Sequence, residues 1–154
     1  MAYITGVEQM FLGRFEHNLD DKSRIIIPAK YRELIKSGAY VTQGFDRNLM
    51  VLTTEVFERV VTYLNELGMT NPDARTLKRL IFSSASPVTF DKLGRFLIPA
   101  YLREFARIEN HVILVGVGDY FEIWSKEEWL KQESSLQNAE VNEHRFAAFE
   151  IHTR

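Results

Sequence analysis

Two segments of this chain, 71 residues apart, share one pattern of polar and apolar positions. Residues 20–35 have the sequence DDKSRIIIPAKYRELI, and residues 91–106 have the sequence DKLGRFLIPAYLREFA. Seven of the 16 aligned positions are identical, and most of the others exchange one apolar residue for another. The match continues, shifted by one residue, between NLMVLTTEVF at 48–57 and YFEIWSKEEW at 120–129. The pattern indicates an internal duplication of roughly 45 residues.

Each copy predicts a short strand, a short helix and two further strands. The apolar runs at 25–27 and 96–98 do not alternate with polar residues, which is typical of a strand covered on both faces. Pro28 and Pro99 follow these runs, and proline suits the first turn of a helix because it lacks a backbone N–H group. The further strands are expected at 40–45 and 49–52 in the first copy, and at 111–117 and 121–124 in the second.

Helical spacing of apolar residues continues outside these strands. Thr53 and Ser125 are expected to cap the helices that follow them, and Glu128 completes a capping box with Ser125. Between the copies, the pattern predicts a helical hairpin, with Pro72 opening its second helix. The apolar stripes of this hairpin are Val56, Val60, Val61 and Leu64 in one helix, and Leu77, Leu80 and Ile81 in the other. The side of the second helix opposite its apolar stripe carries Arg75, Lys78 and Arg79. We favour a face exposed to solvent there over a contact with phosphate or with another subunit.

The duplication also predicts how the chain is organised. A unit of roughly 45 residues is too small to bury a sufficient core by itself. We therefore expect an α+β fold in which the two units interleave their strands around a pseudo-twofold axis into one small barrel. Two independent domains on a linker are the less favoured alternative. The expected parts are the first repeat at 14–57, the linking helices at 58–84, the second repeat at 85–129 and an acidic C-terminal helix or tail at 130–154.

Composition narrows the possible functions. The chain has 154 residues, of which 45% are hydrophobic and 26% charged, as in ordinary globular proteins. It contains no cysteine, and no apolar run approaches the roughly 18 residues that a membrane span requires. The four histidines are far apart, and no P-loop, G-x-S-x-G or G-x-G-x-x-G motif occurs. We expect a cytoplasmic protein that is not an enzyme, with no metal, cofactor, membrane or small-molecule substrate.

The net charge of −2 is unevenly distributed. Residues 1–118 contain 15 basic and 13 acidic side chains, whereas residues 119–154 contain 4 basic and 8 acidic ones. An acidic tail behind a mildly basic body leaves room for a local positive surface. Trp124 and Trp129, which lie at the start of this acidic region, are expected to pack in the core or against another subunit.

Each copy places an aspartate four residues before an arginine, as Asp20 and Arg24 and as Asp91 and Arg95. Aspartate readily stabilises a turn, and its carboxylate can hold a guanidinium in a fixed position. A single motif of this kind is most simply a structural ion pair without an external partner. A pseudo-twofold axis, however, would bring both arginines and Lys22 to one end of the barrel. A paired positive site there suits a DNA backbone or groove.

The segment DKLGRFLIPAYLREF resembles the D-x-x-G-R signature of the AbrB-like, swapped-hairpin DNA-binding domains. The double copy is more similar to the MraZ family, bacterial regulators linked to the division and cell-wall gene cluster. The opening MFLGRFEHNLDDKSRIIIP, the middle DARTLKRLIFSSAS and the closing VILVGVGDYFEIWSKEEW support this resemblance, which covers residues 10 to about 135.

The resemblance implies two AbrB-like repeats forming a double-split β-barrel, and a nucleoid-associated homo-oligomer, a ring, that regulates transcription. It also implies sequence-specific binding to direct repeats in double-stranded promoter DNA upstream of that gene cluster. The residues expected to contact DNA are Arg14, Lys22, Arg24 and Arg95. The motif residues expected to be structural are Asp20, Asp91, Pro28, Pro99, Arg32 and Arg103.

Three features depart from the resemblance. Ser23 aligns with Gly94 of the second copy, so a left-handed backbone conformation is less favourable at Ser23. Lys22 aligns with Leu93, so we expect the two copies to contact DNA unequally. Residues 1–9 precede the usual start, and either Met10 is the initiator or the extra segment is native and disordered.

A second function stays open. In this alternative, the chain is an antitoxin-like interaction module that dimerises through its barrel and binds a partner protein with its acidic C-terminal segment. A stoichiometric partner that co-purifies with the chain would favour this alternative.

Overall fold

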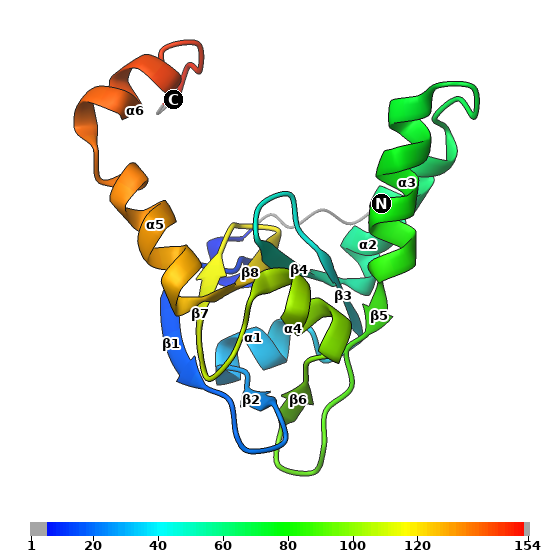
Figure 1. Ribbon diagram of the computed structural model, residues 1–154, viewed down its shortest axis with the longest axis vertical. Helices are drawn as coiled ribbons and strands as arrows, with labels where there is room; N and C mark the ends of the chain where they lie inside the picture. Colours follow the sequence, from blue (N-terminus) through cyan, green and yellow to red (C-terminus); the bar gives the residue numbers. More distant parts are fainter. Residues whose placement is uncertain (1–5, 153–154) are drawn as a thin grey trace.

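The computed structural model describes residues 6–152 as a mixed α and β protein with two antiparallel sheets (Figure 1). Its strands are β1 (Arg14–Asn18), β2 (Arg24–Ile26), β3 (Ala39–Gln43), β4 (Asn48–Thr53), β5 (Ser86–Pro87), β6 (Arg95–Leu97), β7 (His111–Gly116) and β8 (Tyr120–Ser125). Its helices are η1 (Val7–Gln9), α1 (Ala29–Leu34), α2 (Thr54–Asn65), α3 (Pro72–Ser84), α4 (Ala100–Ala106), α5 (Lys126–Leu136) and α6 (Ala139–Arg145). No helix of the described chain is long and apolar enough to cross a membrane.

The strand order confirms that the two copies interleave. The larger sheet has the order β1-β7-β8-β4-β3-β5, and the smaller sheet pairs β2 with β6. In the larger sheet, β1, β3 and β4 of the first copy have their counterparts β5, β7 and β8 at the mirrored positions, and in the smaller sheet β2 pairs with its counterpart β6. The pseudo-twofold axis therefore passes between β4 and β8, and also between β2 and β6. Two independent domains are excluded, because four strand pairs (β1–β7, β4–β8, β3–β5 and β2–β6) join one copy to the other.

The core lies between the two sheets and is built from both copies. Ile25 and Ile27 of the first copy are each 1% exposed, and Phe96 and Ile98 of the second are 2% and 0% exposed. Tyr31 of α1 is fully buried and packs edge-on against Phe11, with ring centroids 5.1 Å apart. The Tyr31 hydroxyl donates a hydrogen bond to the carbonyl of Leu12 over 2.7 Å, and burial raises its pKa to about 12.

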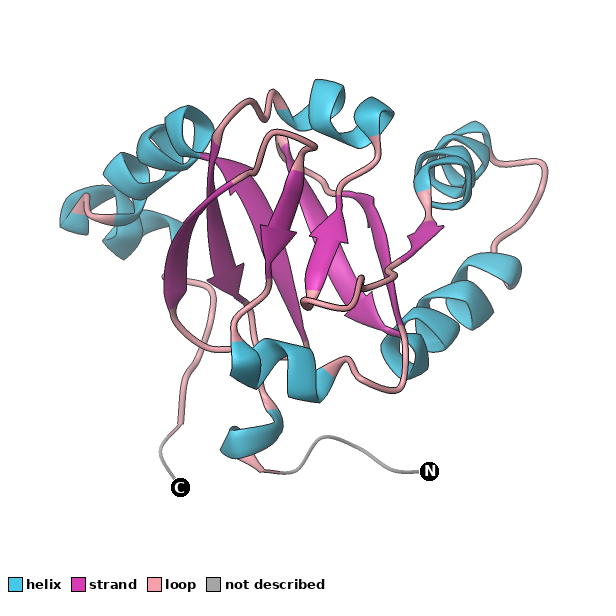
Figure 2. Ribbon diagram, turned by 90° about the horizontal axis from the view of Figure 1, so that it is seen from below, coloured by secondary structure: helices cyan, strands magenta, loops and turns pink. Residues whose placement is uncertain are grey.

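The short strands β2 and β6 correct one expectation. The runs at 25–27 and 96–98 were expected to be covered on both faces, but Ile26 is 52% and Leu97 is 53% exposed. Figure 2, seen from below, shows the two-stranded sheet at the near side of the molecule. Only one of its faces is buried, because Ile25 and Phe96 are 1% and 2% exposed. An apolar run without alternation therefore concealed a strand with one face exposed to solvent.

The helix ends follow the expected local chemistry. Thr53 accepts a hydrogen bond from the Val56 amide at the start of α2, and Ser125 accepts one from the Glu128 amide at the start of α5. Pro28 and Pro99 precede α1 and α4 directly.

The apolar stripes of α2 and α3 form a second cluster with Met50 and Leu52 on the outer face of the larger sheet. Trp124 and Trp129 pack edge-on with centroids 5.6 Å apart, which confirms that they are core residues.

Two projections extend from the body on opposite sides (Figure 1). One is the hairpin of α2 and α3. The other is the C-terminal arm, defined here as residues 126–152, which contains two helices, α5 and α6, where one was expected. Of the N-terminal extension, residues 7–9 form the 3-10 helix η1, while residues 1–5 lie outside the described chain.

The turns before β2 and β6 both contain a residue with a left-handed backbone, a conformation that favours glycine. Gly94 has φ 77°, and its counterpart Ser23 adopts a similar φ of 62°. A side chain at φ > 0 strains the backbone by about 1–2 kcal/mol. A Cβ on Gly94 would also lie 3.0 Å from Nη1 of Arg32.

We expect Gly94→Ala to lower the free energy of unfolding by about 1–2 kcal/mol, because alanine resists the left-handed backbone. Gly68→Ala is the matched control, since Gly68 has no left-handed φ and a Cβ there would meet nothing within 4 Å. Urea denaturation of both variants measures the difference. Equal stabilities for the two variants would show that the turn does not depend on this backbone geometry.

Candidate nucleic-acid interface

The turns that precede β2 and β6 have the same hydrogen-bonded structure. The first carboxylate oxygen of Asp20 accepts the amides of Lys22 and Arg24 at 2.9 and 3.0 Å. In the second copy, Asp91 accepts the amides of Leu93 and Arg95, both at 2.9 Å. These bonds close each turn around an aspartate side chain, which explains why aspartate begins both motifs.

The second carboxylate oxygens link the two turns into one network. Nε of Arg24 donates to Asp20 at 2.9 Å, and Nε of Arg95 donates to Asp91 at 2.7 Å. Each guanidinium also approaches the other copy's carboxylate, at 3.5 Å between Arg24 and Asp91 and 3.6 Å between Arg95 and Asp20. The two arginines expected from the sequence are therefore brought together, and the carboxylates hold them in place.

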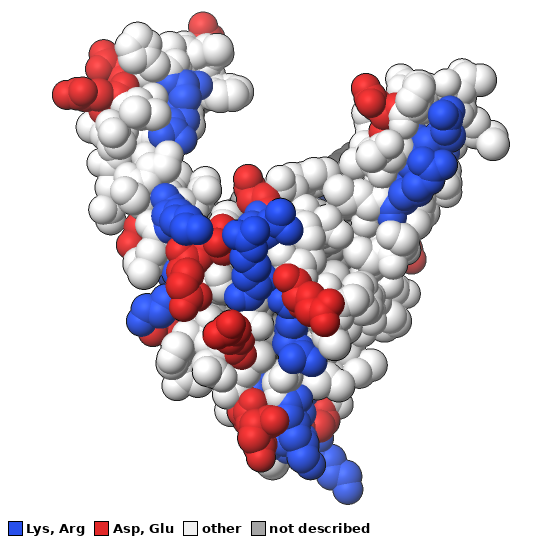
Figure 3. All heavy atoms as spheres, viewed as in Figure 1, with Lys and Arg blue, Asp and Glu red and all other residues white. Residues whose placement is uncertain are grey.

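The network is partly exposed. The four side chains retain between 22% and 31% of their accessible surface. We name the surface formed by residues 20–26 and 91–97 the rim. Figure 3 shows acidic and basic groups side by side at the lower tip of the molecule, where the turns lie. A guanidinium has five N–H donors on three nitrogens, and the contacts above use Nε and Nη1. The geometry leaves Nη2 outside this network.

Hydrogen bonds, chiefly from backbone amides, lower the pKa of both network aspartates. Hydrogen bonds from the Arg24 amide are the largest cause for Asp20, and those from the Arg95 amide are the largest cause for Asp91. The guanidiniums add to this lowering of the pKa through their side-chain hydrogen bonds and their positive charge. Both carboxylates are therefore ionised at neutral pH and hold the arginines as ion pairs.

The other expected residues occupy different places. Lys22 is exposed on the first turn, as required for a contact with DNA. Arg14 lies at the opposite end of β1 from the rim, where it forms an ion pair with Glu133 and lies 5.2 Å from the centre of the Trp129 ring. The structure does not bring Arg14 to the rim.

Arg32 and Arg103 have equivalent structural contacts. Nε of Arg32 donates to the carbonyl of Ile27 at 2.9 Å, and Nε of Arg103 donates to that of Ile98 at 3.0 Å. Each bond fastens a short helix to the end of the strand that precedes it, across the proline.

Three residues of the rim were not expected from the sequence. Lys92 is exposed on the second turn, one position before the site that aligns with Lys22, so both turns carry a lysine. Comparing only aligned positions concealed it. Ile26 and Leu97 are the other two, and the apolar run that contains them was interpreted as buried.

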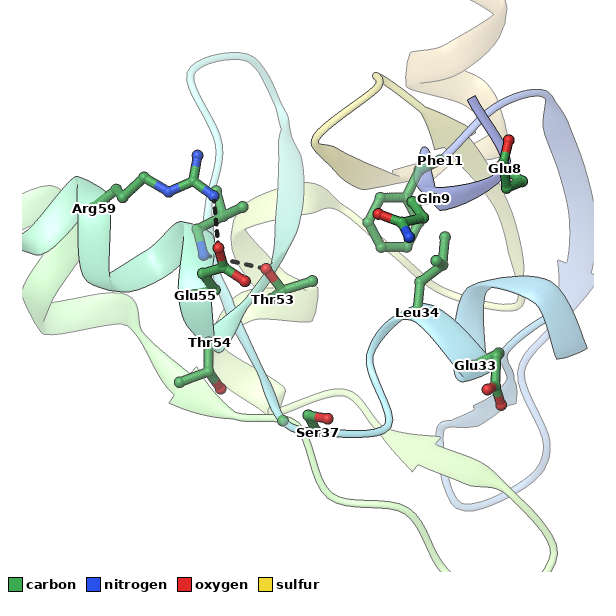
Figure 4. Close-up of a pocket in the computed structure, with 12 residues that line it drawn as sticks. Glu8, Gln9, Phe11, Glu33, Leu34, Ser37, Thr53, Thr54, Glu55 and Arg59 are labelled. Carbon is green, nitrogen blue, oxygen red and sulfur yellow. Dashed lines mark hydrogen bonds and ion pairs between the residues drawn. The ribbon is translucent and has the colours of Figure 1, made fainter. Parts of the chain in front are cut away.

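Two other features of the described chain lie outside the rim. A hollow of about 470 Å³ between α1, α2 and the segment before β1 is lined by the carboxylates Glu8, Glu33 and Glu55, with Glu55 paired to Arg59 at 3.3 Å (Figure 4). Its acidic lining repels phosphate. In β8, burial raises the pKa of Glu122, which accepts a hydrogen bond from Nε1 of Trp124 at 3.0 Å. In the hollow, three carboxylates outnumber one arginine, and the guanidinium of that arginine pairs with Glu55, so neither feature resembles the rim as a site for an anion.

Comparison with known proteins identifies the family to which the chain is similar. The model of the family described as "MraZ protein, putative antitoxin-like" matches the chain twice, at residues 10–80 and 81–150. The chain is 42% identical over 120 residues to a protein of Herpetosiphon aurantiacus named transcriptional regulator MraZ, covering 78% of this chain and 84% of that protein.

Two further relatives carry the same name. A protein of Thermomicrobium roseum is 42% identical over 127 residues, covering 82% of this chain and 89% of that protein. One of Lactiplantibacillus plantarum is 42% identical over 125 residues, covering 81% and 89%.

The network predicts a dependence of stability on acid. Because the pKa of Asp91 is lower in the folded protein than its ordinary value of 3.8, its ionised form stabilises the fold above that pH. This contribution is lost as the pH falls through the lower folded-state pKa. We expect the melting temperature of the wild type to fall more steeply below pH 4 than that of Asp91→Asn. Asp21→Asn, which leaves the network intact, should keep the wild-type profile, and identical profiles for all three proteins would contradict the expectation.

Proposed function

The chain belongs to the MraZ family, and from this premise we propose that it is a sequence-specific DNA-binding transcriptional regulator without enzymatic activity. The observation that carries the proposal is the network of Asp20, Arg24, Asp91 and Arg95. This network sets two guanidiniums from different copies side by side on an exposed rim. The relatives named as transcriptional regulators support it.

The rim suits DNA for a physical reason. Base and phosphate recognition needs cations whose positions are fixed before binding, because less entropy is then lost on association. The carboxylates fix both arginines, and Lys22 and Lys92 stand exposed on the turns beside them. The rim contains four basic and three acidic side chains, so one protomer offers only a small net positive charge. We infer that a single protomer binds DNA weakly.

We propose that the protein acts as a ring-shaped homo-oligomer on direct repeats upstream of the division and cell-wall gene cluster, as the family resemblance implies. The fold is proposed to be the double-split β-barrel of that family. Joining several weak sites in one assembly multiplies their affinity, because each additional contact forms at a high local concentration. A cytoplasmic, nucleoid-associated location follows from this function.

Apolar surface on both projections supports the assembly. A groove of about 410 Å³ along α2 and α3, the α2–α3 groove, is lined mainly by apolar side chains, including Val56, Tyr63, Leu77, Val117 and Tyr120. The C-terminal arm exposes Phe146, Phe149 and Ile151, which are 48%, 70% and 90% exposed. Within one chain these features lie on opposite sides of the body (Figure 1). Insertion of each arm into the groove of the next protomer is a head-to-tail contact. Such contacts produce a ring when the rotation between neighbouring protomers brings the last one back to the first.

Charge favours the same pairing. The C-terminal arm contains six acidic and three basic side chains. The α3 helix carries Arg75, Lys78 and Arg79, and Figure 3 shows basic groups along this projection. Opposite charges on the arm and on α3 favour contact between these two projections of neighbouring protomers.

A second candidate function is an antitoxin-like module whose acidic arm binds a different protein. The description of the matching family favours it, and the exposed arm offers the required surface. A partner protein that co-purifies in stoichiometric amount and is lost with the arm would distinguish it from the ring.

Arg24→Ala is expected to weaken DNA binding by about 1–3 kcal/mol, or roughly 5- to 150-fold, because it removes a fixed guanidinium and leaves two carboxylates facing the phosphates. Arg47→Ala is the control, since Arg47 lies over the Phe105 ring, away from the rim, and carries the same charge. Fluorescence anisotropy with the DNA upstream of the chain's own coding sequence measures both. Unchanged affinity for Arg24→Ala would remove the rim from the binding site.

Phe149→Ser is expected to shift the protein toward smaller species and to abolish the advantage of repeated over single DNA sites, because it removes an apolar anchor of the arm. Sedimentation gives the mass, and circular dichroism shows whether the fold is retained. Leu12→Ser, at a 44% exposed position outside the arm, should leave the assembly unchanged. If monomers and rings bound repeated DNA sites with equal affinity, multivalent binding would be the wrong mechanism.

A further inference from the structure

The outward face of the β2–β6 sheet carries two exposed apolar side chains. Ile26 is 52% and Leu97 is 53% exposed, and the two residues occupy equivalent positions in the two copies. Their neighbours in sequence, Ile25 and Phe96, point inward and are 1% and 2% exposed. Both copies therefore present one apolar group to solvent from the same strand position.

The pairing of the strands places these groups among the arginines. Arg24 lies opposite Leu97, and Ile26 lies opposite Arg95. Alternate residues of a strand share a face, so all four side chains stand on the outer face of the sheet. The result is a small square in which two cations occupy one diagonal and two apolar groups occupy the other.

We propose that Ile26 and Leu97 contact thymine methyl groups in the major groove of DNA, a proposal that rests on the DNA-binding function above. The major groove admits a two-stranded β-ribbon. Among the base edges exposed there, the C5-methyl of thymine is the apolar group, and apolar side chains recognise it by contact. Arg24 and Arg95, beside these side chains, match the hydrogen-bond acceptors of guanine or of the phosphates.

The charge of the rim supports a role for base contacts. With four basic and three acidic side chains in the rim, attraction to phosphates alone is modest for one protomer. Selection among DNA sequences must then come from contacts to base edges or from DNA shape. Ile26 and Leu97 stand where such contacts form.

The alternative occupant of this face is an apolar protein surface, which the arrangement disfavours. The core of a protein interface is depleted in charged residues. Here the two apolar side chains lie on one diagonal of the square, and Arg24 and Arg95 separate them. Burying such a face against protein would remove two guanidiniums from water together with the apolar groups.

The test removes single methyl groups from the DNA. The probe is the duplex that the wild-type protein protects upstream of its own coding sequence, resynthesised with deoxyuridine in place of one thymine at a time. We expect at least one replacement to weaken wild-type binding about fourfold, the value of one buried methyl group. The Ile26→Ala or the Leu97→Ala variant should bind the thymine duplex more weakly than the wild type does. Deoxyuridine at the sensitive position should not weaken the binding of that variant any further.

Met69→Ala is the matched control, because Met69 is 78% exposed in the turn between α2 and α3 and lies far from the rim. It should keep the wild-type response to deoxyuridine. Wild-type binding that no replacement weakens would overturn the thymine contact and leave the DNA-binding function intact. So would full deoxyuridine sensitivity in both alanine variants. If the wild-type protein protects no duplex, the DNA-binding function itself fails, and the thymine contact fails with it.

Discussion

The structure depends on one constraint, which is that neither copy of the repeat can bury its apolar residues alone. Each half of the chain supplies strands that are completed by the other half, most clearly where β4 pairs with β8 at the centre of the larger sheet. The core residues of the smaller sheet, Ile25 and Phe96, lie opposite one another across the same axis. Because small domains bury only a limited share of their apolar surface, sharing one core lets each unit bury residues that it would expose alone. Separating the halves would expose both.

The exchange of strands also creates the candidate site. Antiparallel pairing of β2 with β6 places the two turns at opposite ends of this ladder, but each strand has only three residues, so the four charged side chains still meet across the axis. Exposed ion pairs stabilise proteins weakly, so the network is better explained by its geometry than by its contribution to folding. It holds two guanidiniums at a fixed separation on an open surface. The same pairing positions Ile26 and Leu97 between them.

The two projections give the molecule a direction that the pseudo-twofold body lacks. The α2–α3 hairpin and the C-terminal arm follow β4 and β8 at equivalent places, and Thr53 and Ser125 cap their first helices. They differ in charge, because α3 carries three basic residues and one acidic residue, whereas the arm is acidic. A symmetric body carrying two different ends can associate head to tail through unlike surfaces. The short strands and their turns thus form the rim, and the two unlike projections offer surfaces for assembly. The proposed regulator would use both.

Local chemistry in the sequence determined much of the result. Residue pattern and size predicted the duplication, the order of strand, helix, strand and strand within each copy, the caps at Thr53 and Ser125, and the meeting of Arg24 with Arg95. They did not predict β1, β5 or α6. Which side of a three-residue strand faces solvent was decided by tertiary structure, because Ile25, Ile26 and Ile27 have the same side chain and give no alternation. The position of Arg14 beside α5 likewise required the path of the whole chain. A sequence pattern reveals the buried face of a strand only where apolar and polar residues alternate. Where every residue is apolar, the exposed face depends on which distant segments of the chain cover the strand.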